Sequence, residues 1–255
     1  MSCRRRRLLS LPPALPLLLA LAPGCASPTT RALTVAPEPT AQEVADWNER
    51  AEAGDPAAQF LLALRLEQGR GEPADPERAA RWYGHAAEQG FAPAQNNLGL
   101  LCFEGRGVAQ DDVAAARWYR AAAEQGFARA QGNLGLLYLL GRGVPRDEAR
   151  AALWLERAGR QGEPRAQALL GAMHRQGLGV PADARTAARW MRLAAEGGLT
   201  DAQFAWGWML QHGEGVAADG AEAARWYERA AEGGSAVAAT QLGLMRLEGR
   251  GVARD

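Results

Sequence analysis

The residues that could do chemistry in this chain are few, and their spacing argues against a catalytic centre. His85, His174 and His212 lie on different predicted elements and share no metal-ligand spacing, since neither a His-Glu-x-x-His nor a Cys-x-x-Cys run occurs. Ser235 is the only serine after Ser27, so a serine nucleophile with a base beside it is not expected. All 29 basic residues are arginine, and the lack of lysine excludes a P-loop, a Schiff-base lysine and a Ser-x-x-Lys hydrolase. We therefore expect no catalytic, metal-binding or cofactor-binding residues.

The charge and composition of the chain also exclude several classes of protein. The 255 residues carry 29 basic and 29 acidic side chains, so the excess of positive charge typical of a nucleic-acid-binding domain is missing. With 47% apolar and 23% charged residues, the composition fits neither a disordered acidic chain nor a polytopic membrane protein. We expect no nucleic-acid partner, and we interpret Cys102, on the apolar face of a predicted helix, as a core thiol.

The first 24 residues have the pattern of a signal peptide. Four arginines at 4–7 precede an apolar run of about 15 residues at 8–22, which is too short and too rich in proline for a membrane-spanning helix. The Gly24-Cys25 junction resembles the lipobox of bacterial lipoproteins, whose cysteine becomes lipidated. An ordinary cleaved signal peptide and a twin-arginine signal are the alternatives. Residues 25–40 have the composition of a flexible linker.

Lipidation of Cys25 would give the protein a membrane contact through an N-terminal lipid anchor. The expected location is then the cell envelope, in the periplasm. Ala26, rather than Asp, follows the cysteine, and this favours an outer-membrane lipoprotein. A secreted protein is the alternative.

The rest of the chain is built on one repeat of 36 residues. Gly-x-Gly pairs and tryptophans recur with this step: the pairs start at residues 69, 105, 141, 177, 213 and 249, and the tryptophans are at 82, 118, 154, 190 and 226. A fixed period between 20 and 50 residues is typical of solenoids, propellers and similar arrays. Because β-branched residues are scarce and no alternating run appears, the repeats are predicted to be helical.

Each repeat is predicted to contain two helices. In residues 91–126 the first helix spans about 92–104 and ends at Gly105, which can take the left-handed conformation of a helix end. Asp111 is placed to cap the second helix, which runs to about residue 125. Gly99 inside the first helix predicts close contact with a neighbouring helix, because a side chain there would clash. Trp118 on the second helix is expected to fill the space between neighbouring repeats.

This pattern resembles the Sel-one-like repeat family, a relative of the tetratricopeptide repeat. The matching residues in the second repeat are Ala94, Leu98, Gly99, Gly105, Gly107, Val108, Ala115, Trp118, Ala122, Ala123 and Gly126. The resemblance implies an all-α fold, a right-handed α-solenoid of stacked antiparallel helix pairs. It also implies an adaptor or scaffold for protein assembly, since members of this family generally act in that way and bacterial members are often associated with the envelope.

The expected solenoid covers residues 41–255. Residues 41–54 read as a lone second helix that caps the N-terminal end. The repeats are expected at 55–90, 91–126, 127–162, 163–198 and 199–234, with a partial repeat at 235–255. The first helix of this partial repeat lacks a partner, so either its face is open for docking or the sequence continues beyond Asp255.

Residues that vary between repeats on the first helix are candidates for partner contact, because that helix lines the concave side of related solenoids. Phe204 and Trp208 lie one helical turn apart, and the remaining apolar candidates are Phe103 and Leu139. Exposed aromatic residues are common interface anchors, although some of these side chains could belong to the core instead. Three amides could bind an extended peptide backbone or simply be solvated: Asn96, Asn97 and Asn133.

Two functions remain open at this point. The first is a non-catalytic scaffold or adaptor of the bacterial cell envelope, with a protein or peptide partner on the concave helix face. The second is an envelope enzyme that acts on cell-wall or β-lactam substrates. Secreted relatives linked to β-lactams pair two cysteines in each repeat, whereas the repeats here contain Cys102 alone, so that activity is not carried over.

Overall fold

The computed structural model describes residues 38–249 and 251, and all regular structure in this part of the chain is helical. After α2 (Ala41–Glu52), helices alternate between a first helix, called helix A, and a second, called helix B. The A helices are α3 (Pro56–Gln68), α5 (Ala92–Glu104), α7 (Ala128–Leu140), α9 (Pro164–Gln176), α11 (Thr200–His212) and α13 (Ala236–Glu248). The B helices are α4 (Pro76–Glu88), α6 (Asp112–Glu124), α8 (Glu148–Arg160), α10 (Ala184–Glu196) and α12 (Gly220–Glu232).

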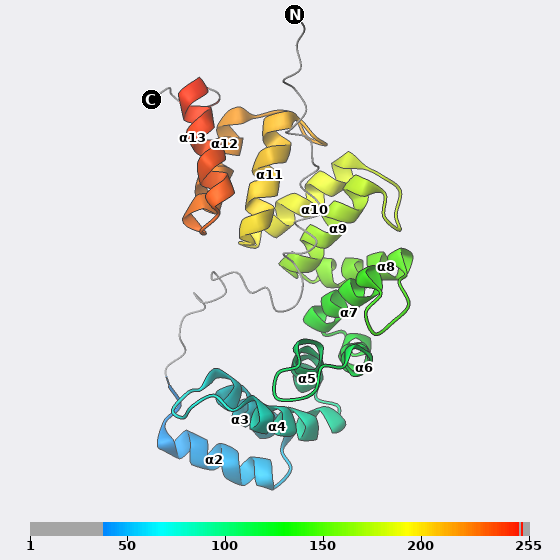
Figure 1. The fold of residues 1–255 in the computed structure, drawn as a ribbon, viewed down its shortest axis with the longest axis vertical. Helices are drawn as coiled ribbons and strands as arrows, with labels where there is room; N and C mark the ends of the chain where they lie inside the picture. Colours follow the sequence, from blue (N-terminus) through cyan, green and yellow to red (C-terminus); the bar gives the residue numbers. More distant parts are fainter. Residues whose placement is uncertain (1–37, 250, 252–255) are drawn as a thin grey trace, which may run out of the picture.

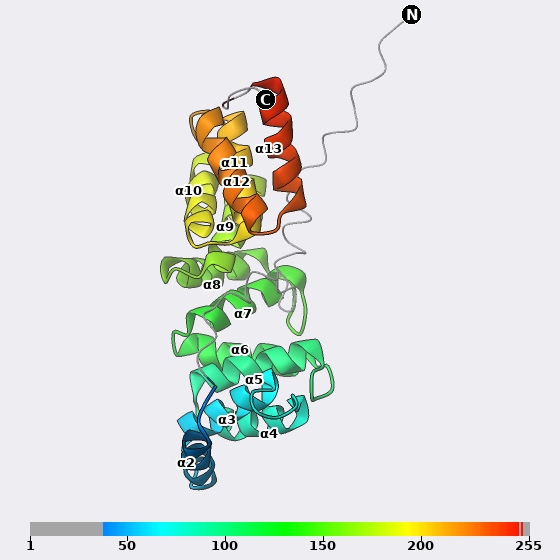
Figure 2. The same ribbon diagram turned by 90° about the vertical axis from the view of Figure 1, so that its left-hand side faces the viewer.

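The helix pairs stack into an elongated array, which confirms the expected all-α solenoid. Figures 1 and 2 show the pairs following one another from α2 at one end to α13 at the other. In the middle of the arc in Figure 1, α5 and α7 lie on the inner side and α6 and α8 on the outer side. One continuous core of buried residues runs from α3 to α13.

The start of each B helix and the end of each A helix are set by the residues that the repeat pattern predicted. Asp111 accepts hydrogen bonds from the backbone N–H groups of Val113 and Ala114, both at 2.9 Å, and so caps α6. The equivalent aspartates at 75, 147, 183 and 219 cap the other B helices. Gly105 ends α5 with φ of 68°, in the left-handed region that glycine adopts without strain. These boundaries depend on local contacts alone.

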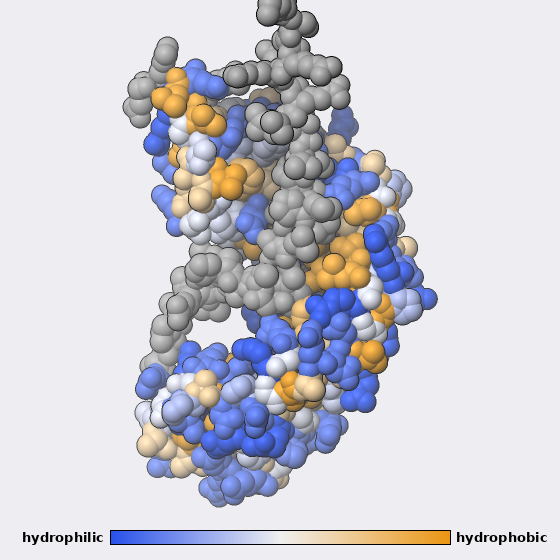
Figure 3. All heavy atoms as spheres, viewed as in Figure 1, coloured by the Kyte–Doolittle hydropathy of each residue, from blue (hydrophilic) through white to orange (hydrophobic). Residues whose placement is uncertain are grey.

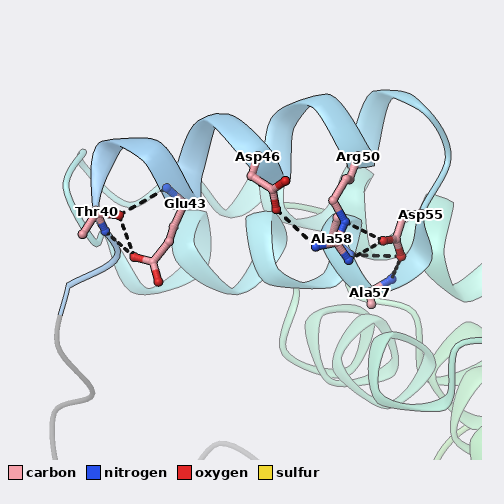
Figure 4. A network of polar contacts seen from close by, with 7 residues as sticks. All are labelled: Thr40, Glu43, Asp46, Arg50, Asp55, Ala57 and Ala58. Carbon is pink, nitrogen blue, oxygen red and sulfur yellow. Dashed lines mark hydrogen bonds and ion pairs between the residues drawn. The ribbon is translucent and has the colours of Figure 1, made fainter.

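The N-terminal helix α2 contacts the first repeat through a small buried cluster of Ala51, Ala58 and Leu62 and through surface charges. Thr40 and Glu43 form a reciprocal capping box at its start, and Arg50 near its end binds Asp46 at 3.2 Å and Asp55 at 2.6 Å (Figure 4). Asp55 also caps α3, so Arg50 connects the end of α2 to the beginning of the next helix. Exposed ion pairs of this kind add little stability, about 0–1 kcal/mol each.

Glycines inside the A helices allow the two helices of a repeat to touch. A Cβ atom built on Gly99 would lie 2.9 Å from the ring of Tyr119, and one on Gly135 would lie 2.7 Å from Leu155. Both distances are shorter than real contacts of this kind. The prediction of a close helix contact at this level is therefore confirmed.

The residue that fills the space between the two helices of a repeat is the one after the tryptophan, and the repeat pattern did not single it out. Tyr119 has no exposed surface, whereas Trp118 is half-buried, with the Arg117 guanidinium 4.8 Å from its ring centroid. The residue after each repeat tryptophan is buried throughout the array: Tyr83, Tyr119, Leu155, Met191 and Tyr227. Four of the repeat tryptophans, Trp82, Trp118, Trp154 and Trp190, are half-buried and pack at the edge of this core, whereas Trp226 is 7% exposed and belongs to it. A Cβ atom on Gly159 of α8 would lie 3.2 Å from the Trp190 ring on α10, so this tryptophan does reach the preceding repeat.

A ladder of buried glutamines, which the repeat pattern did not predict, joins neighbouring repeats. The Gln95 side chain donates to the backbone carbonyl of Ala87 in the preceding repeat at 3.1 Å and accepts from Gln125 at 2.8 Å. Gln59, Gln131 and Gln167 make the same bond to the preceding helix end. The signal was visible as glutamines 36 residues apart. The same carbonyls also accept from the backbone N–H three residues later, as Gly90 donates to Ala87 at 3.0 Å, so each glutamine adds a second bond that ties a helix end to the next repeat.

The second glycine of each Gly-x-Gly turn sets how closely neighbouring repeats approach. Gly107 has φ of 68°, and a Cβ atom on it would lie 2.1 Å from the backbone oxygen of Pro76, at the start of α4 in the preceding repeat. Gly143, Gly179, Gly215 and Gly251 touch the equivalent helix starts. The turn is thus an inter-repeat contact between two backbones as well as a bend.

Replacing Tyr119 with alanine is expected to lower the free energy of unfolding by about 3–5 kcal/mol, because the change empties the plug of α5 and α6. Trp118→Ala should cost less, under about 2 kcal/mol, since part of that ring already faces water. Tyr119→Phe should change stability by less than about 0.5 kcal/mol, because the buried hydroxyl has no hydrogen-bond partner. Urea unfolding followed by circular dichroism measures all three. A larger loss for Trp118→Ala than for Tyr119→Ala would contradict the assignment.

Gln131→Leu is expected to cost about 1–2 kcal/mol, because it removes the hydrogen bonds to the carbonyl of Ala123 and from the amide of Gln161, although each of these groups keeps one other bond. Gln203→Leu is the matched control. Gln203 makes only a 3.5 Å contact with the carbonyl of Ala195, and Gly233 stands where a second glutamine would be. Equal losses in the two variants, measured by the same unfolding experiment, would show that the ladder does not stabilise the array.

Candidate partner-binding site

The described residues contain no arrangement suited to metal or nucleophile chemistry. No group of three or more His, Cys, Asp or Glu side chains in residues 38–249 and 251 could hold a metal ion. His85 and His212 are exposed, and His174 is half-buried. Burial raises the pKa of the Cys102 thiol, and the nearby Asp111 carboxylate adds to this shift, so the thiol stays protonated. Within the same ranges no helix is both long and apolar enough to cross a membrane.

Phe204 and Trp208, the two aromatic candidates on α11, line the same small pocket. Both are half-buried, and the pocket of about 30 Å³ between α9, α10 and α11 is also lined by Gly171, Ala172, Arg175, Met191, Ala205 and Met209. Ala172 is one reason for the space, because Leu100 and Leu136 occupy this position in the two preceding repeats. We call these eight residues the α9–α11 pocket. Small-molecule sites are roughly ten or more times larger, so the pocket suits a single side chain.

Contacts within the array hold both aromatic rings in place. The Phe204 ring lies 5.5 Å from the ring of Tyr227, the buried plug of its own repeat. The Trp208 ring stacks on His212, with centroids 4.2 Å apart and planes at 24°. Nδ1 of His212 lies 2.8 Å from the Trp208 carbonyl, and this fixes the imidazole against the indole. The two rings are therefore positioned before any partner arrives, which reduces the entropy lost on binding.

Arg175 is the one ionisable residue among those that line the α9–α11 pocket. Its side chain is 17% exposed, and its Nε atom lies 3.9 Å from Glu214, in the turn after α11. By comparison, Arg142 binds Asp112 through two hydrogen bonds of 2.7 and 2.6 Å. The Arg175–Glu214 pair is thus long and uses little of the donor capacity of a guanidinium, which has five N–H groups.

The structure does not leave Phe103 and Leu139 as exposed anchors. Phe103 is 4% exposed and Leu139 is 6% exposed. The Arg142 guanidinium of the following repeat lies 3.8 Å from the Phe103 ring centroid and is held there by Asp112. The expectation that these two side chains contribute to an open surface is therefore wrong, because a contact between repeats covers the phenyl ring and both residues join the core.

The asparagines bind one another and are not free amides. Asn133 donates to Asn96 at 3.0 Å, Asn96 donates to Asn97 at 3.1 Å, and Asn97 donates to the Tyr83 hydroxyl at 3.0 Å. The Tyr83 hydroxyl in turn donates to Glu67 at 2.8 Å. Asn96 is only 5% exposed, while Asn97 and Asn133 are half-buried. The idea of three amides open to a peptide backbone is thus wrong for Asn96, and the other two already have partners.

The hydroxyl groups at the ends of the buried tyrosines are not acid–base groups near neutral pH. Burial raises the pKa of Tyr83 far above its ordinary value, and the adjacent Glu67 carboxylate raises it further. Burial likewise raises the pKa of Tyr119 and of Tyr227. These groups therefore act as neutral hydrogen-bonding or packing residues. The predicted lipidation site, Cys25, lies outside the described residues.

The surface differs in character along the array. Figure 3 shows mainly hydrophilic atoms over α2 to α4 and more hydrophobic surface toward α9 and α13. The asparagine network begins at the hydrophilic end, and the α9–α11 pocket lies toward the other. Of the seven candidate partner-binding residues, the structure brings Phe204 and Trp208 together at a pocket. It places the other five in the core or in a hydrogen-bonded network.

Solved structures with the same repeat are similar to this chain. One is a protective antigen of uropathogenic Escherichia coli with an SLR fold, with a TM-score of 0.77 and 36% identity over 83% of this chain and 45% of that chain. Another is a Sel1 repeat protein from Oxalobacter formigenes, with a TM-score of 0.73 and 37% identity over 80% of this chain and 60% of that chain. The chain thus spans about half the length of these two relatives.

An immunity protein from Pseudomonas aeruginosa, 20% identical with a TM-score of 0.51 over 72% of this chain and 68% of that chain, shares the fold. No curated protein matches the chain. The family model described as Sel1 repeat matches six successive segments, each beginning one residue later than the repeats expected from the sequence: 56–91, 92–127, 128–163, 164–199, 200–235 and 236–255. Since these segments together cover residues 56–255, the chain belongs to the Sel1 repeat family.

Proposed function

We propose that this chain is a non-catalytic scaffold that binds a protein or peptide partner on the face of its A helices. Sel1 repeat proteins generally mediate protein–protein interactions and are typically not catalytic. The observation that carries the proposal for this chain is the α9–α11 pocket, where Phe204 and Trp208 flank a space suited to one side chain. Large aromatic residues beside a small pocket are typical centres of a protein interface.

The departures from the repeat pattern support this use of the pocket. Leucine stands at the Trp208 position in repeats one, two, three and six, as Leu64, Leu100, Leu136 and Leu244, so the solenoid does not require tryptophan there. The small Ala172 leaves the Trp208 ring beside a space rather than against a leucine. The tryptophan at 208 adds aromatic surface, and the alanine at 172 leaves a space beside it. Neither departure from leucine adds a hydrogen bond to the core.

Binding should depend on Trp208 more than folding does. The probe is a library of random twelve-residue peptides displayed on phage, selected on the wild-type protein, with affinities of the enriched peptides then measured by calorimetry. Trp208→Leu places the common residue of the array at this position and is expected to weaken binding at least thirtyfold, or about 2 kcal/mol. Trp118→Leu, on a B helix outside the pocket, is the matched control and should leave affinity unchanged.

Thermal unfolding of the same variants separates the two roles of Trp208. A small change in melting temperature together with the loss of binding supports an anchor. A large loss of stability with normal affinity per folded molecule would show that Trp208 belongs to the core and would remove it from the site.

We further propose that Cys25 is lipidated and holds the protein in the cell envelope, as an outer-membrane lipoprotein facing the periplasm. The support is in the sequence, where the Gly24-Cys25 junction follows a basic segment and an apolar run and precedes a linker. One chain binds membranes only reversibly, so stable anchoring would take further acylation of the same cysteine.

Cys25→Ser is expected to abolish labelling of the protein with a radioactive fatty acid and to release it from the membrane fraction. Cys3→Ser is the matched control, because Cys3 precedes the apolar run and is removed with the signal peptide. Unchanged labelling of the Cys25→Ser protein would contradict the lipid anchor and leave a secreted protein as the alternative.

A further inference from the structure

The chemistry of the α9–α11 pocket specifies its partner more closely. Resting on the proposed function, we propose that the pocket binds an aliphatic side chain of an extended peptide and that Arg175 binds an acidic side chain two residues away from it. The partner motif is thus an aliphatic residue, any residue, and then Asp or Glu, in either chain direction. Neither the repeat pattern nor the fold requires this preference.

The aliphatic part of the motif follows from the lining of the pocket. Apart from Arg175, the wall consists of glycine, alanine, methionine, phenylalanine and tryptophan residues. A space of about 30 Å³ is closer in size to the end of a leucine, isoleucine or valine side chain than to an aromatic ring. Met191 and Met209 are flexible and polarisable, so they can adjust to the shape of a branched side chain. A polar group there would lose its hydration without gaining a hydrogen bond.

The acidic part follows from Arg175. The equivalent positions in the neighbouring repeats are Leu139 and Gln211, so the array does not need a positive charge there. The Arg175 side chain lines the pocket, and its ion pair with Glu214 is long, at 3.9 Å. A carboxylate brought by a partner could form the short, paired hydrogen bonds that Arg142 makes with Asp112. Arginine is the residue best suited to such two-point recognition.

The spacing of the motif follows from helix geometry. Ala172 and Arg175 are three residues apart on α9, so their Cβ atoms lie roughly 5–6 Å apart on one side of the helix. Alternate side chains of an extended peptide point to the same side and are separated by about 7 Å. An aliphatic side chain over Ala172 therefore places the side chain two residues away, rather than its neighbour, beside Arg175.

Glu214 allows the role of Arg175 to be tested by an increase as well as a decrease in affinity for an acidic peptide. Its carboxylate competes with the partner for Arg175, so removing its charge should strengthen binding of an acidic peptide. Removing the charge of Arg175 should weaken the same binding. The two substitutions lie on opposite members of one ion pair, so general damage to the site cannot produce opposite changes in affinity.

The experiment uses peptides enriched from the random twelve-residue library on the wild-type protein. Each peptide is compared with a version in which the acidic residue becomes its amide. On the wild type the amide version should bind at least tenfold more weakly, about 1.4 kcal/mol. On Arg175→Gln, which carries the residue type found at position 211, the two versions should bind within about threefold of each other. Glu214→Gln should bind the acidic peptide more tightly.

Two further variants complete the design. Ala172→Leu restores the leucine of repeats two and three, fills the pocket, and should abolish binding of both peptide versions. Arg189→Gln removes an exposed positive charge from α10 that does not line the pocket, and it should change nothing. Because Arg175→Gln and Ala172→Leu both introduce residue types that the array already holds at equivalent positions, the folded state should persist, and circular dichroism checks this.

The outcomes separate this inference from the function on which it rests. Peptides that need Trp208 but lack an acidic residue, or that bind Arg175→Gln as well as the wild type, would overturn the acidic motif and leave the scaffold function standing. Peptides that are indifferent to both Trp208→Leu and Ala172→Leu would overturn the site itself. A selection that enriches no peptide would overturn both.

Discussion

Close approach between backbones is the constraint on which the rest of this structure depends. Within a repeat, Gly99 brings α5 against the Tyr119 ring, and between repeats Gly107 brings a turn against the start of α4. A side chain at either glycine would overlap its neighbour, so the distance between helices has almost no freedom at these points. The 36-residue period persists without insertion because the second turn glycine recurs at the same place in every repeat, and the helix glycine does so in every repeat but the first, where Ala63 stands. The variable positions on the A helices therefore also recur with a spacing of 36 residues.

The helices were predictable because local residues determine where they begin and end. Asp111 caps α6 and Gly105 ends α5 through contacts within a few residues, and both signals can be read without knowing the rest of the fold. The identity of the plug was not predictable in the same way. Trp118 and Tyr119 are adjacent aromatic residues, and adjacent positions on a helix point about 100° apart. Which of the two rings faces the core depends on how α6 is rotated against α5. The 36-residue period does not distinguish the two positions, because both recur with it.

The candidate site was likewise predictable where it depends on single positions, and not where it depends on contacts between repeats. Phe204 and Trp208 could be found by comparing equivalent positions of the repeats, because these positions vary from repeat to repeat and that variation is visible in the sequence. The comparison could not show that Arg142 of one repeat covers Phe103 of another, or that Asn133 reaches back to Asn96. These contacts join residues in different repeats, and each depends on side-chain direction as well as register. The glutamine ladder was missed because a polar residue in a helix is usually solvated, whereas these side chains reach the carbonyls of a preceding helix end.

The two parts of the A-helix face therefore differ in how much bonding capacity remains for a partner. In the asparagine network each amide donates to its neighbour and the series ends on Glu67, so a peptide would have to break existing bonds to bind there. At the α9–α11 pocket a leucine has become alanine, another has become tryptophan, and an arginine has only a distant carboxylate. Such changes cost the array little, because the backbone contacts that set its register lie elsewhere. Specific recognition on a repetitive scaffold then arises where the sequence departs from its own repeat, since repeated residues are already used in holding the repeats together.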